Sequence, residues 1–412
     1  MQTNLAADIK DTARGQEADA ILRKCVHCGF CTATCPTYQL FGDELDGPRG
    51  RIYLIKQMLE GEPVTEKTRL HLDRCLSCRS CESTCPSGVQ YSRLLDIGRE
   101  MVAEKVPRTG AGHWKRLALK TLLPRRGLFT PAATLGRALR PLLPAALAAK
   151  LPDRPARGAW PEPRHSRRMI ALAGCVQPGL APDINAATAR VLDAAGISLV
   201  EADKAGCCGA VRFHLDDAEG AREDARRNIA AWWPLIEAGA EAIVVTASGC
   251  GVQVKDYGHL LRDDAAWRER AAAVGNLARD VSEIVIAEKE RLAQKLAAVG
   301  PAGKKAAFHS PCTLQHGLKI RGVVEELLTA AGFELTFVPD SHLCCGSAGT
   351  YSVLQPEISG KLRDNKMEAL NTGAPEIIAT ANIGCLIHLQ SGSGHPVRHW
   401  IELLAQRLEG GD

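Results

Sequence analysis

Hydrophobic and polar positions follow two different patterns along this 412-residue chain. In its second half, short apolar runs typical of buried parallel strands alternate with longer stretches whose apolar residues recur every three or four positions, as on one face of a helix. The strand-like runs are 168–172, 197–201, 242–246, 305–308, 334–338 and 376–380, and the helical stretches are 182–195, 217–236, 318–331 and 356–371. Strands that alternate with helices predict parallel sheets covered by helices.

The first part of the chain shows no such alternation. Its clearest element is a helical stretch over 50–59, and a basic amphipathic stretch follows over 113–123. We therefore predict an α+β protein with a helical N-terminal domain and two α/β modules with parallel sheets. The predicted parts are the N-terminal domain over 15–105, a basic proline-rich linker over 106–167, and the two modules over 168–300 and 301–412.

The sixteen cysteines of the chain form two internal repeats. In the N-terminal domain, four cysteines and a proline recur at an offset of 50 residues. In the second half, a cysteine, a Cys-Cys pair and a further cysteine recur at offsets of 137 and 135. The first repeat comprises Cys25, Cys28, Cys31, Cys35 and Cys75, Cys78, Cys81, Cys85, and the second comprises Cys175, Cys207, Cys208, Cys250 and Cys312, Cys344, Cys345, Cys385. Every cysteine falls in a repeat, so none is left for incidental packing.

The N-terminal repeat has the spacing C-x2-C-x2-C-x3-C-P, which is typical of domains with two [4Fe–4S] clusters. Three thiolates in a tight loop bind one cluster, whereas the fourth cysteine, followed by proline, binds the other. Zinc sites more often use two Cys-x-x-Cys pairs without a terminal proline. The predicted ligands are Cys25, Cys28, Cys31 and Cys85 for one cluster and Cys75, Cys78, Cys81 and Cys35 for the other.

In the two C-terminal modules the cysteines follow predicted strands. Because the carboxyl ends of parallel strands form the ligand crevice of an open α/β sheet, three strand ends would bring four thiols to one place in each module. Gly209 and Gly346 follow the Cys-Cys pairs and would let the backbone turn sharply there. All eight cysteines are therefore candidate metal ligands, and His309, His316 and His388 could add ligands in the second module alone.

Charge is unevenly distributed, although the net charge is only +4. Residues 105–168 contain fifteen Lys or Arg, two Asp or Glu and nine prolines, a local charge of +13 that leaves about −9 for the rest. Such a segment is either a solvated connector or a docking surface for anionic lipid or an acidic partner. No nucleic-acid-binding motif accompanies it, so we expect no nucleic-acid partner.

The start of the chain is polar and lacks the apolar segment of a secretory signal. The sequence also lacks a run of about 18 apolar residues, so we expect no transmembrane helix. These features predict a cytoplasmic protein, in contact with the inner face of the cytoplasmic membrane at most peripherally. In that compartment, clustered cysteines indicate metal or redox ligands and not disulfides.

The sequence resembles the iron–sulfur subunits of glycolate oxidase. It also shares its Cys-Cys-Gly (CCG) modules with the heterodisulfide reductase B subunit and with subunits of glycerol-3-phosphate and lactate dehydrogenases. The matching stretches are AGCCGAVRFHL (205–215), TASGCG (246–251), PCTLQHG (311–317), PDSHLCCGSAGTY (339–351), ANIGC (381–385) and VRHWIELL (397–404). The resemblance covers nearly the whole chain and implies a two-cluster ferredoxin domain fused to two CCG modules.

Each module departs from the heterodisulfide reductase pattern at one position. That pattern ends in Cys-x-x-Cys, whereas Gln253 and His388 stand three residues after Cys250 and Cys385. With only four thiols in each module, the noncubane cluster of the five-cysteine form is in doubt. A cubane cluster, a zinc ion and no metal all remain open for these modules.

The resemblance implies a subunit that relays electrons, without catalytic residues of its own. Oxidation of a hydroxy acid removes two electrons as a hydride, so a flavin must stand between the substrate and one-electron clusters. The chain has no G-x-G-x-x-G after a strand. The implied partners are FAD-containing flavoprotein subunits that oxidise glycolate to glyoxylate, and a quinone or other membrane acceptor. The alternatives are the equivalent subunit of a D-lactate or glycerol-3-phosphate dehydrogenase, a heterodisulfide-reductase-like enzyme acting at its CCG modules, and a zinc-bound scaffold.

Overall fold

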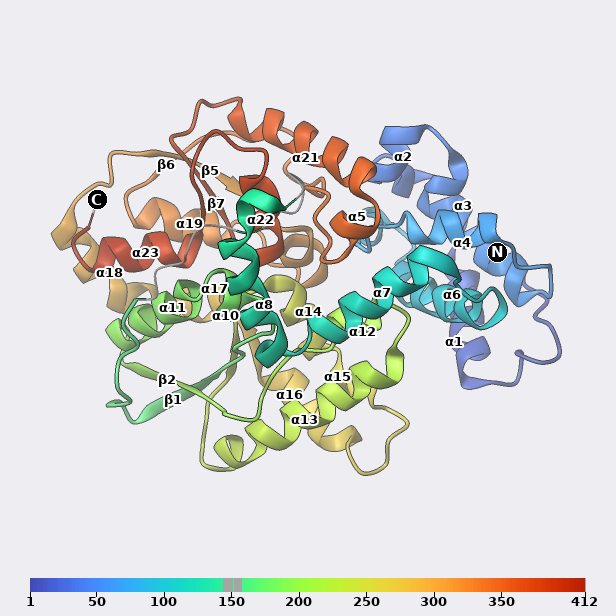
Figure 1. Ribbon diagram of the computed structural model, residues 1–412, viewed down its shortest axis with the longest axis horizontal. Helices are drawn as coiled ribbons and strands as arrows, with labels where there is room; N and C mark the ends of the chain where they lie inside the picture. Colours follow the sequence, from blue (N-terminus) through green and yellow to red (C-terminus); the bar gives the residue numbers. More distant parts are fainter. Residues whose placement is uncertain (144–150, 152–157, 412) are drawn as a thin grey trace. The chain divides into compact units, whose positions relative to one another are not determined.

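The computed structural model describes residues 1–143, 151 and 158–411, and they form two compact units (Figure 1). The first unit comprises Met1–Lys115, Gln315–Gly317 and His342–Lys366, and the other described residues form the second. The module predicted over 301–412 thus contributes residues to both units. The mixed α+β class is as predicted.

The first unit is helical. Its helices are α1 (Ala13–Lys24), α2 (Pro36–Phe41), α3 (Pro48–Leu59), α4 (Glu66–Asp73), α5 (Ser80–Thr84), α6 (Tyr91–Lys105) and α20 (Tyr351–Leu354), with short 3-10 turns over Phe30–Thr32 and Glu44–Asp46. Ile55 and Leu59 of α3 pack with Leu94 and Leu95 of α6 in one buried core. Gly98 lets these two helices approach closely, because a Cβ at this position would lie 2.7 Å from the Ile55 side chain.

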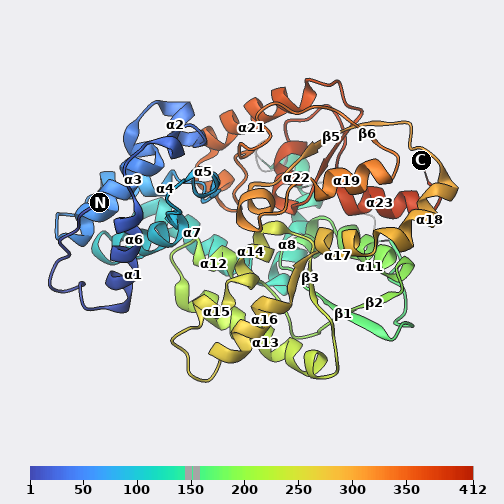
Figure 2. The same cartoon turned by 180° about the vertical axis from the view of Figure 1, so that it is seen from behind.

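The first module, in the second unit, has a four-stranded parallel sheet. Its strands are β1 (Arg167–Ala171), β2 (Ile197–Glu201), β3 (Ile243–Val245) and β4 (Ala278–Asp280), in the order β2-β1-β3-β4. Its helices are α10 (Gln177–Leu180), α11 (Asp183–Ala194), α12 (Ala210–Phe213), α13 (Ala218–Glu237), α14 (Ser248–Lys255), α15 (Tyr257–Leu260), α16 (Arg268–Leu277), α17 (Val281–Ala287) and α18 (Lys289–Val299). Figure 2 shows α13, α15 and α16 side by side. Between them they bury Trp232 and Tyr257, which stack.

The second module repeats the same strand order, β6-β5-β7-β8, also parallel. Its strands are β5 (Lys305–His309), β6 (Glu334–Leu335), β7 (Ile377–Thr380) and β8 (Val397–His399), and its helices are α19 (Val323–Ala330), α21 (Pro356–Asn371), α22 (Ile383–Gln390) and α23 (Trp400–Leu408). A π-helical turn covers Thr313–Gly317. The predicted strands and helices of both modules are confirmed with three exceptions. The strand β6 is shorter than predicted, α19 begins five residues later than the helix predicted over 318–331, and β4 and β8 were not predicted.

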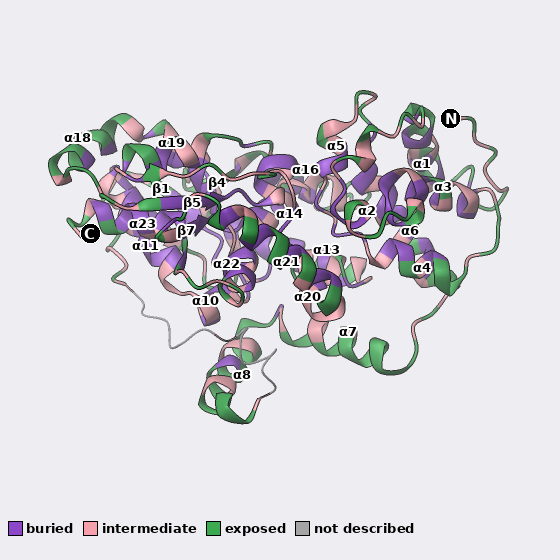
Figure 3. Ribbon diagram, turned by 90° about the horizontal axis from the view of Figure 1, so that it is seen from above, coloured by how far each residue is buried: buried purple, intermediate pink, exposed green. Residues whose placement is uncertain are grey.

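The linker predicted over 106–167 contains two helices among its described residues. They are α7 (Gly110–Leu122) and α8 (Arg126–Ala138), followed by a 3-10 turn over Arg140–Leu142. The predicted helix over 113–123 is thus confirmed. Figure 3 shows that both helices are largely exposed. Residues 144–150 and 152–157 of the predicted linker lie outside the described part.

No helix in the described part of the chain is both long and apolar enough to cross a bilayer.

Candidate functional site

The first cysteine loop of the N-terminal domain is wound tightly by two residues with positive φ. Cys25 ends α1, and its N–H donates to the carbonyl of Leu22. His27 (φ 57°) and Gly29 (φ 85°) then turn the backbone towards Cys31. The pKa of Cys31 is raised to about 11, first by burial and then by the negative charges of Cys25, Cys85 and Cys28. These four thiols are therefore close neighbours.

The second loop repeats this backbone at the same offset of 50 residues. Ser77 (φ 54°) and Arg79 (φ 60°) take the places of His27 and Gly29. Burial, followed by the negative charges of the neighbouring cysteines, raises the pKa of the Cys81 thiol well above its usual value. Those neighbours are Cys78, Cys75 and Cys35. Each predicted ligand set is thus brought together, including the cysteine that crosses from the other loop, and the ligand assignment stays a prediction.

The donor sets and their surroundings fit iron–sulfur clusters. The first set lines a cavity of about 30 Å³ whose wall also includes Ile52 and Tyr91. All four members of the second set, Cys35, Cys75, Cys78 and Cys81, are buried. Burial disfavours the thiolate form, whereas a bound metal cation favours it strongly, so metal binding would offset the raised thiol pKa values.

The first CCG module gathers its four thiols as predicted. The pKa of Cys207 is lowered well below its usual value, because the thiols of Cys175 and Cys208 donate hydrogen bonds to its sulfur. The pKa of Cys208 is raised by its hydrogen bonds with Cys207 and Cys250. The four sulfur atoms therefore form a chain of contacts in the order Cys175, Cys207, Cys208, Cys250.

Two side chains outside the predicted ligand set hold this Cys-Cys loop. The amide of Asn228 donates to the carbonyl of Cys207 (2.7 Å), and the hydroxyl of Tyr257 donates to the carbonyl of Cys208 (3.0 Å). Gly209 has a φ of 91°, and its N–H donates to the Cys207 sulfur (3.4 Å). The sharp turn expected from this glycine is present. Sequence reasoning missed Asn228 and Tyr257, because both are distant from the Cys-Cys pair along the chain.

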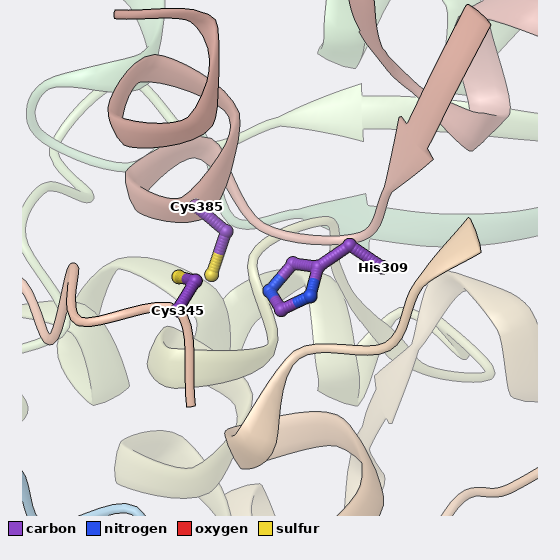
Figure 4. Close-up of side chains that lie close together, drawn as sticks. All are labelled: His309, Cys345 and Cys385. Carbon is purple, nitrogen blue, oxygen red and sulfur yellow. The ribbon is translucent and has the colours of Figure 1, made fainter. Parts of the chain in front are cut away.

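The thiols of the second module are divided between the two units. In the second unit, Cys385 of α22 and His309 at the end of β5 are buried, and a ring nitrogen of His309 lies within 4.8 Å of the Cys385 sulfur (Figure 4). Cys312 belongs to the same unit. Cys345, also drawn in Figure 4, belongs with Cys344 to the first unit.

The Cys-Cys loop of the second module repeats the backbone geometry of the first. Gly346 has a φ of 85°, and its N–H donates to the Cys344 sulfur (3.4 Å). A Cβ at Gly346 would lie 2.7 Å from the carbonyl oxygen of Ser359, whose hydroxyl donates to the Gly346 carbonyl. A glycine is therefore required here for both its φ and its close packing.

Two further side chains attach this loop to the helical domain inside the first unit. The Tyr351 hydroxyl donates to the carbonyl of Arg74 (3.0 Å). The ring nitrogens of His316 form hydrogen bonds with the Ser83 hydroxyl and the His342 carbonyl (both 2.9 Å). Because both of its nitrogens are bonded in this way, His316 serves here as a packing residue. His388, the third histidine considered as a ligand, is buried in α22.

Comparisons with known proteins agree with this organisation. A family model described as a 4Fe-4S dicluster domain matches residues 21–89, and one described as a cysteine-rich domain (CCG) matches 170–255 and 306–390. The chain is 57% identical over 411 residues to the glycolate oxidase iron–sulfur subunit of Escherichia coli K12, covering 99% of this chain and 100% of that protein. It is 33% identical over 403 residues to a probable glycolate oxidase iron–sulfur subunit of Bacillus subtilis, covering 90% and 89%.

A shorter protein matches part of the chain. The lactate utilization protein A of an Exiguobacterium species is 28% identical over 241 residues, which cover 57% of this chain and 96% of that protein. The family resemblance inferred from the cysteine motifs is confirmed by these matches, as is the fusion of a ferredoxin-type domain with two CCG regions.

Proposed function

Because this chain belongs to the family of glycolate oxidase iron–sulfur subunits, we propose that it is the electron-transfer subunit of a complex that oxidises glycolate to glyoxylate. Its partners would be FAD-containing flavoprotein subunits on the donor side and a quinone or other membrane acceptor on the other. The observation that carries this proposal is the gathering of two crossed sets of four cysteines in one helical domain. The chain alone would carry electrons and catalyse no reaction.

The residues of the helical domain have separate tasks in this proposal. When bound, two [4Fe–4S] clusters supply one-electron transfer between a two-electron flavin and the acceptor. Cys25, Cys28, Cys31 and Cys85 would hold one cluster, and Cys75, Cys78, Cys81 and Cys35 the other. Buried side chains such as Ile52 and Tyr91 keep water from the thiolates, and this lowers the local dielectric constant around them.

The Cys-Cys loop of the second module is the proposed site that exchanges electrons with the ferredoxin-type clusters. Tyr351 lies between this loop and the cysteine set that includes Cys75. Its pKa is raised first by burial and then by the negative charge of Cys75, with Cys344 adding a smaller effect of the same sign. Since all three residues belong to one compact unit, we propose that a metal centre involving Cys344 and Cys345 exchanges electrons with the cluster at Cys75. The eight cysteines of the modules remain candidate ligands for a further iron–sulfur or zinc centre.

Metal analysis tests the cofactor content. Anaerobically prepared chain should contain at least about eight iron and eight sulfide, the content of two cubane clusters. The variant Cys35→Ser should lose the cluster of Cys75, Cys78 and Cys81 and keep the other one. Loss of the cluster at Cys25, Cys28 and Cys31 in that variant would contradict the crossed assignment. Full electron transfer by a preparation that holds only zinc would contradict the proposal itself.

The substrate is tested on the complex. The tagged chain should co-purify with an FAD-containing protein, and the complex should reduce an artificial acceptor with glycolate faster than with D-lactate or glycerol-3-phosphate. The partial similarity to lactate utilization protein A makes lactate the main alternative substrate. Preference for D-lactate would assign the chain to that reaction, and turnover of a disulfide by the isolated chain would favour a heterodisulfide-reductase-like activity.

We also propose a peripheral membrane contact through the linker helices. Residues 110–143 contain seven Lys or Arg and no Asp or Glu. On α8, exposed leucines recur at helical spacing and continue into the following turn: Leu128, Leu135, Leu139 and Leu142. The opposite side of α8 packs against α10, where Phe129 contacts Gly179. An exposed apolar stripe flanked only by cations suits the interface of an anionic bilayer.

Vesicle binding tests this contact. Each Lys or Arg near an anionic surface contributes about 1 kcal/mol, and salt weakens the attraction. The Gln variant of Lys115, Arg116, Lys120, Arg125 and Arg126 should release the chain from vesicles that contain phosphatidylserine, and Leu135→Ser with Leu142→Ser should weaken binding in the presence of salt. Unchanged binding by both variants would leave the linker as a connector only.

A further inference from the structure

Two arginines of α3 lie two residues apart but in opposite environments. The side chain of Arg49 is 37% exposed and forms an ion pair with Glu44 (2.6 Å). The side chain of Arg51 is 1% exposed. A guanidinium is almost never fully buried without partners, because its desolvation costs several kcal/mol. The hydrogen-bond and ion-pair partners of Arg51 therefore indicate the role of this buried guanidinium.

Arg51 reaches one of the predicted cluster ligands through a hydroxyl. Its Nη1 donates to Thr37 Oγ1 (3.1 Å), and Thr37 Oγ1 lies 3.3 Å from the sulfur of Cys35. Its Nε donates to the carbonyl of His71 (2.8 Å). The one proton of the Thr37 hydroxyl goes to the carbonyl of Asp46 (2.6 Å), so this hydroxyl does not pass a hydrogen bond on to a ligated sulfur, which has no proton. Arg51 therefore acts on Cys35 through its charge, across a single hydroxyl oxygen.

The buried charge around Arg51 does not cancel. Its Nη2 donates to Oδ1 of Asp46 (3.4 Å), which also bonds to Nδ1 of His71. The other oxygen of Asp46 accepts from Arg74 (2.7 Å). One carboxylate thus faces two guanidinium groups, and the three together carry a net charge of +1.

Arg51 keeps its proton in this environment. Burial acts to lower its pKa, but the negative charges that Cys75 and Cys35 carry as thiolates outweigh burial and raise it above the usual value. Tyr91, which is also buried, adds a second polar contact, because its hydroxyl donates to the Cys75 sulfur (3.7 Å). A cation and a hydrogen-bond donor therefore both act on the set of Cys35, Cys75, Cys78 and Cys81.

The cations near the other ligand set are less buried. The N-terminal ammonium of Met1, which is partly buried, donates to the Cys25 carbonyl (2.7 Å). Arg49 donates to the carbonyl of His27 (3.5 Å), but its charge is neutralised by Glu44 and is partly exposed to solvent. Solvent screens such a pair. This set also includes the exposed Cys28, whereas every cysteine of the other set is buried. Burial alone would make the second cluster the harder one to reduce, because reduction adds negative charge in a medium of low dielectric constant.

We propose that Arg51, assisted by Tyr91, raises the reduction potential of the cluster at Cys35, Cys75, Cys78 and Cys81, so that this buried cluster accepts electrons from the more exposed one. The positive charge stabilises the reduced form, and hydrogen bonds to ligand sulfurs act in the same direction. The inference rests on the proposed function, since it requires two bound clusters. Its consequence is that electrons collect in the half of the domain that contacts Tyr351.

A redox titration of the full chain, prepared anaerobically and followed by electron paramagnetic resonance, tests the role of Arg51. Arg51→Gln should lower one of the two midpoint potentials by at least about 59 mV, which corresponds to a tenfold change for a one-electron couple. Arg49→Gln is the matched control, because it removes a cation from the same helix, and it should shift either midpoint by less than half of that amount.

Two conservative variants keep the test decisive if Arg51→Gln fails to load its cluster. Arg51→Lys should load both clusters and keep the midpoint near that of the wild type, and Tyr91→Phe should lower the same midpoint by a smaller amount. Equal shifts in Arg51→Gln and Arg49→Gln, or no shift in Arg51→Gln and Tyr91→Phe with both clusters loaded, would overturn the inference. A wild-type chain that binds fewer than two clusters would instead contradict the proposed function.

Discussion

The two CCG modules share a strand order but support their thiols in different ways. In the first module, the chain between α14 and β4 contains two additional helices, α15 and α16, and α15 supplies Tyr257 to hold the Cys-Cys loop. In the second module, the described residues 391–396 between α22 and β8 contain no helix. Its Cys-Cys loop is held instead by Tyr351 and His316, within the unit that contains the helical domain.

The same thiol motif is therefore supported within its own module in one case and by the helical domain in the other. The first module is self-sufficient, because its four thiols and their supports belong to one unit. The Cys-Cys loop of the second module belongs to the helix-rich unit that also contains the eight predicted cluster ligands. The second module is therefore the better candidate for a place in electron transfer, and the first for a local or structural centre.

The largest expected effect comes from removing the Cys-Cys thiols of each module in turn. Cys344→Ser with Cys345→Ser should abolish electron flow from substrate to acceptor in the assembled complex, because the proposed metal centre at these two thiols is lost. Cys207→Ser with Cys208→Ser should retain most of the flow. Activity with an artificial acceptor and the resonance signals of the ferredoxin clusters would be measured in both variants.

These two double variants control for each other, since each changes two buried sulfurs to oxygens in the same Cys-Cys-Gly motif. The ferredoxin signals should stay intact in both. Normal electron flow in the variant of Cys344 and Cys345 would mean that the second module is structural. That result would support the hypothesis of a zinc-bound scaffold. Loss of flow in the variant of Cys207 and Cys208 alone would reverse the comparison between the modules.

The second expected effect is an opposite response of the two modules to pH. The helix after the last strand begins with a capping box in both, Asp280 with Glu283 in the first and His399 with Glu402 in the second. Burial raises the pKa of Asp280 from 3.8 to about 6. Burial lowers the pKa of His399 from 6.5 to about 4.

The two shifts act on stability with opposite signs. Between pH 4 and 6 the folded chain binds more protons at Asp280 than the unfolded chain does, so this group favours folding as the pH falls. Between pH 6.5 and 4 the unfolded chain binds more protons at His399 than the folded chain does. Folding therefore becomes less favourable at this group as the pH falls. One pKa unit corresponds to about 1.4 kcal/mol, so each contribution amounts to roughly 3 kcal/mol over its full range.

Matched asparagine variants separate the two contributions, because asparagine is a good N-cap. Asp280→Asn should make the midpoint temperature of unfolding fall more steeply between pH 7 and 5 than in the wild type. His399→Asn should make it fall less steeply or rise. The same slope in both variants and the wild type would show that neither buried group titrates as described.

Much of this comparison could be predicted from the sequence, because strands and cysteine positions recur with the repeat. The predicted run 197–201 coincides with β2, and the predicted helix 356–371 coincides with α21. The three-residue strands β4 and β8 were missed, since Ala-Arg-Asp and Val-Arg-His are too short and too polar to show a strand pattern. Their strand geometry comes from pairing with β3 and β7.

The surroundings of the thiols could not be predicted in the same way. The sequence leaves Arg49 and Arg51 equal, as cations that offset the clusters or as surface arginines. The burial of Arg51 alone depends on Thr37, Asp46 and His71 coming together in the fold. Tyr257 stands 49 residues after Cys208, whereas Tyr351 stands six residues after Cys345, so no common spacing marks them. The candidate ligands follow from local spacing, whereas the side chains that surround them are brought there by tertiary contacts.

The smallest expected effect separates the two tyrosines. Tyr257 is fully buried, and its hydroxyl donates to the Cys208 carbonyl and accepts from the Asn228 amide (3.1 Å). Tyr257→Phe leaves both groups without this partner inside the core, which should cost about 1 to 3 kcal/mol. Tyr351→Phe loses one hydrogen bond to a partly buried carbonyl, which should cost about 0.5 to 1.5 kcal/mol. Hydrogen exchange should rise around residues 207–209 in the first variant and around 342–354 in the second. Faster exchange at 207–209 in Tyr351→Phe would contradict the independence of the two loops, because the first loop is held by Asn228 and Tyr257.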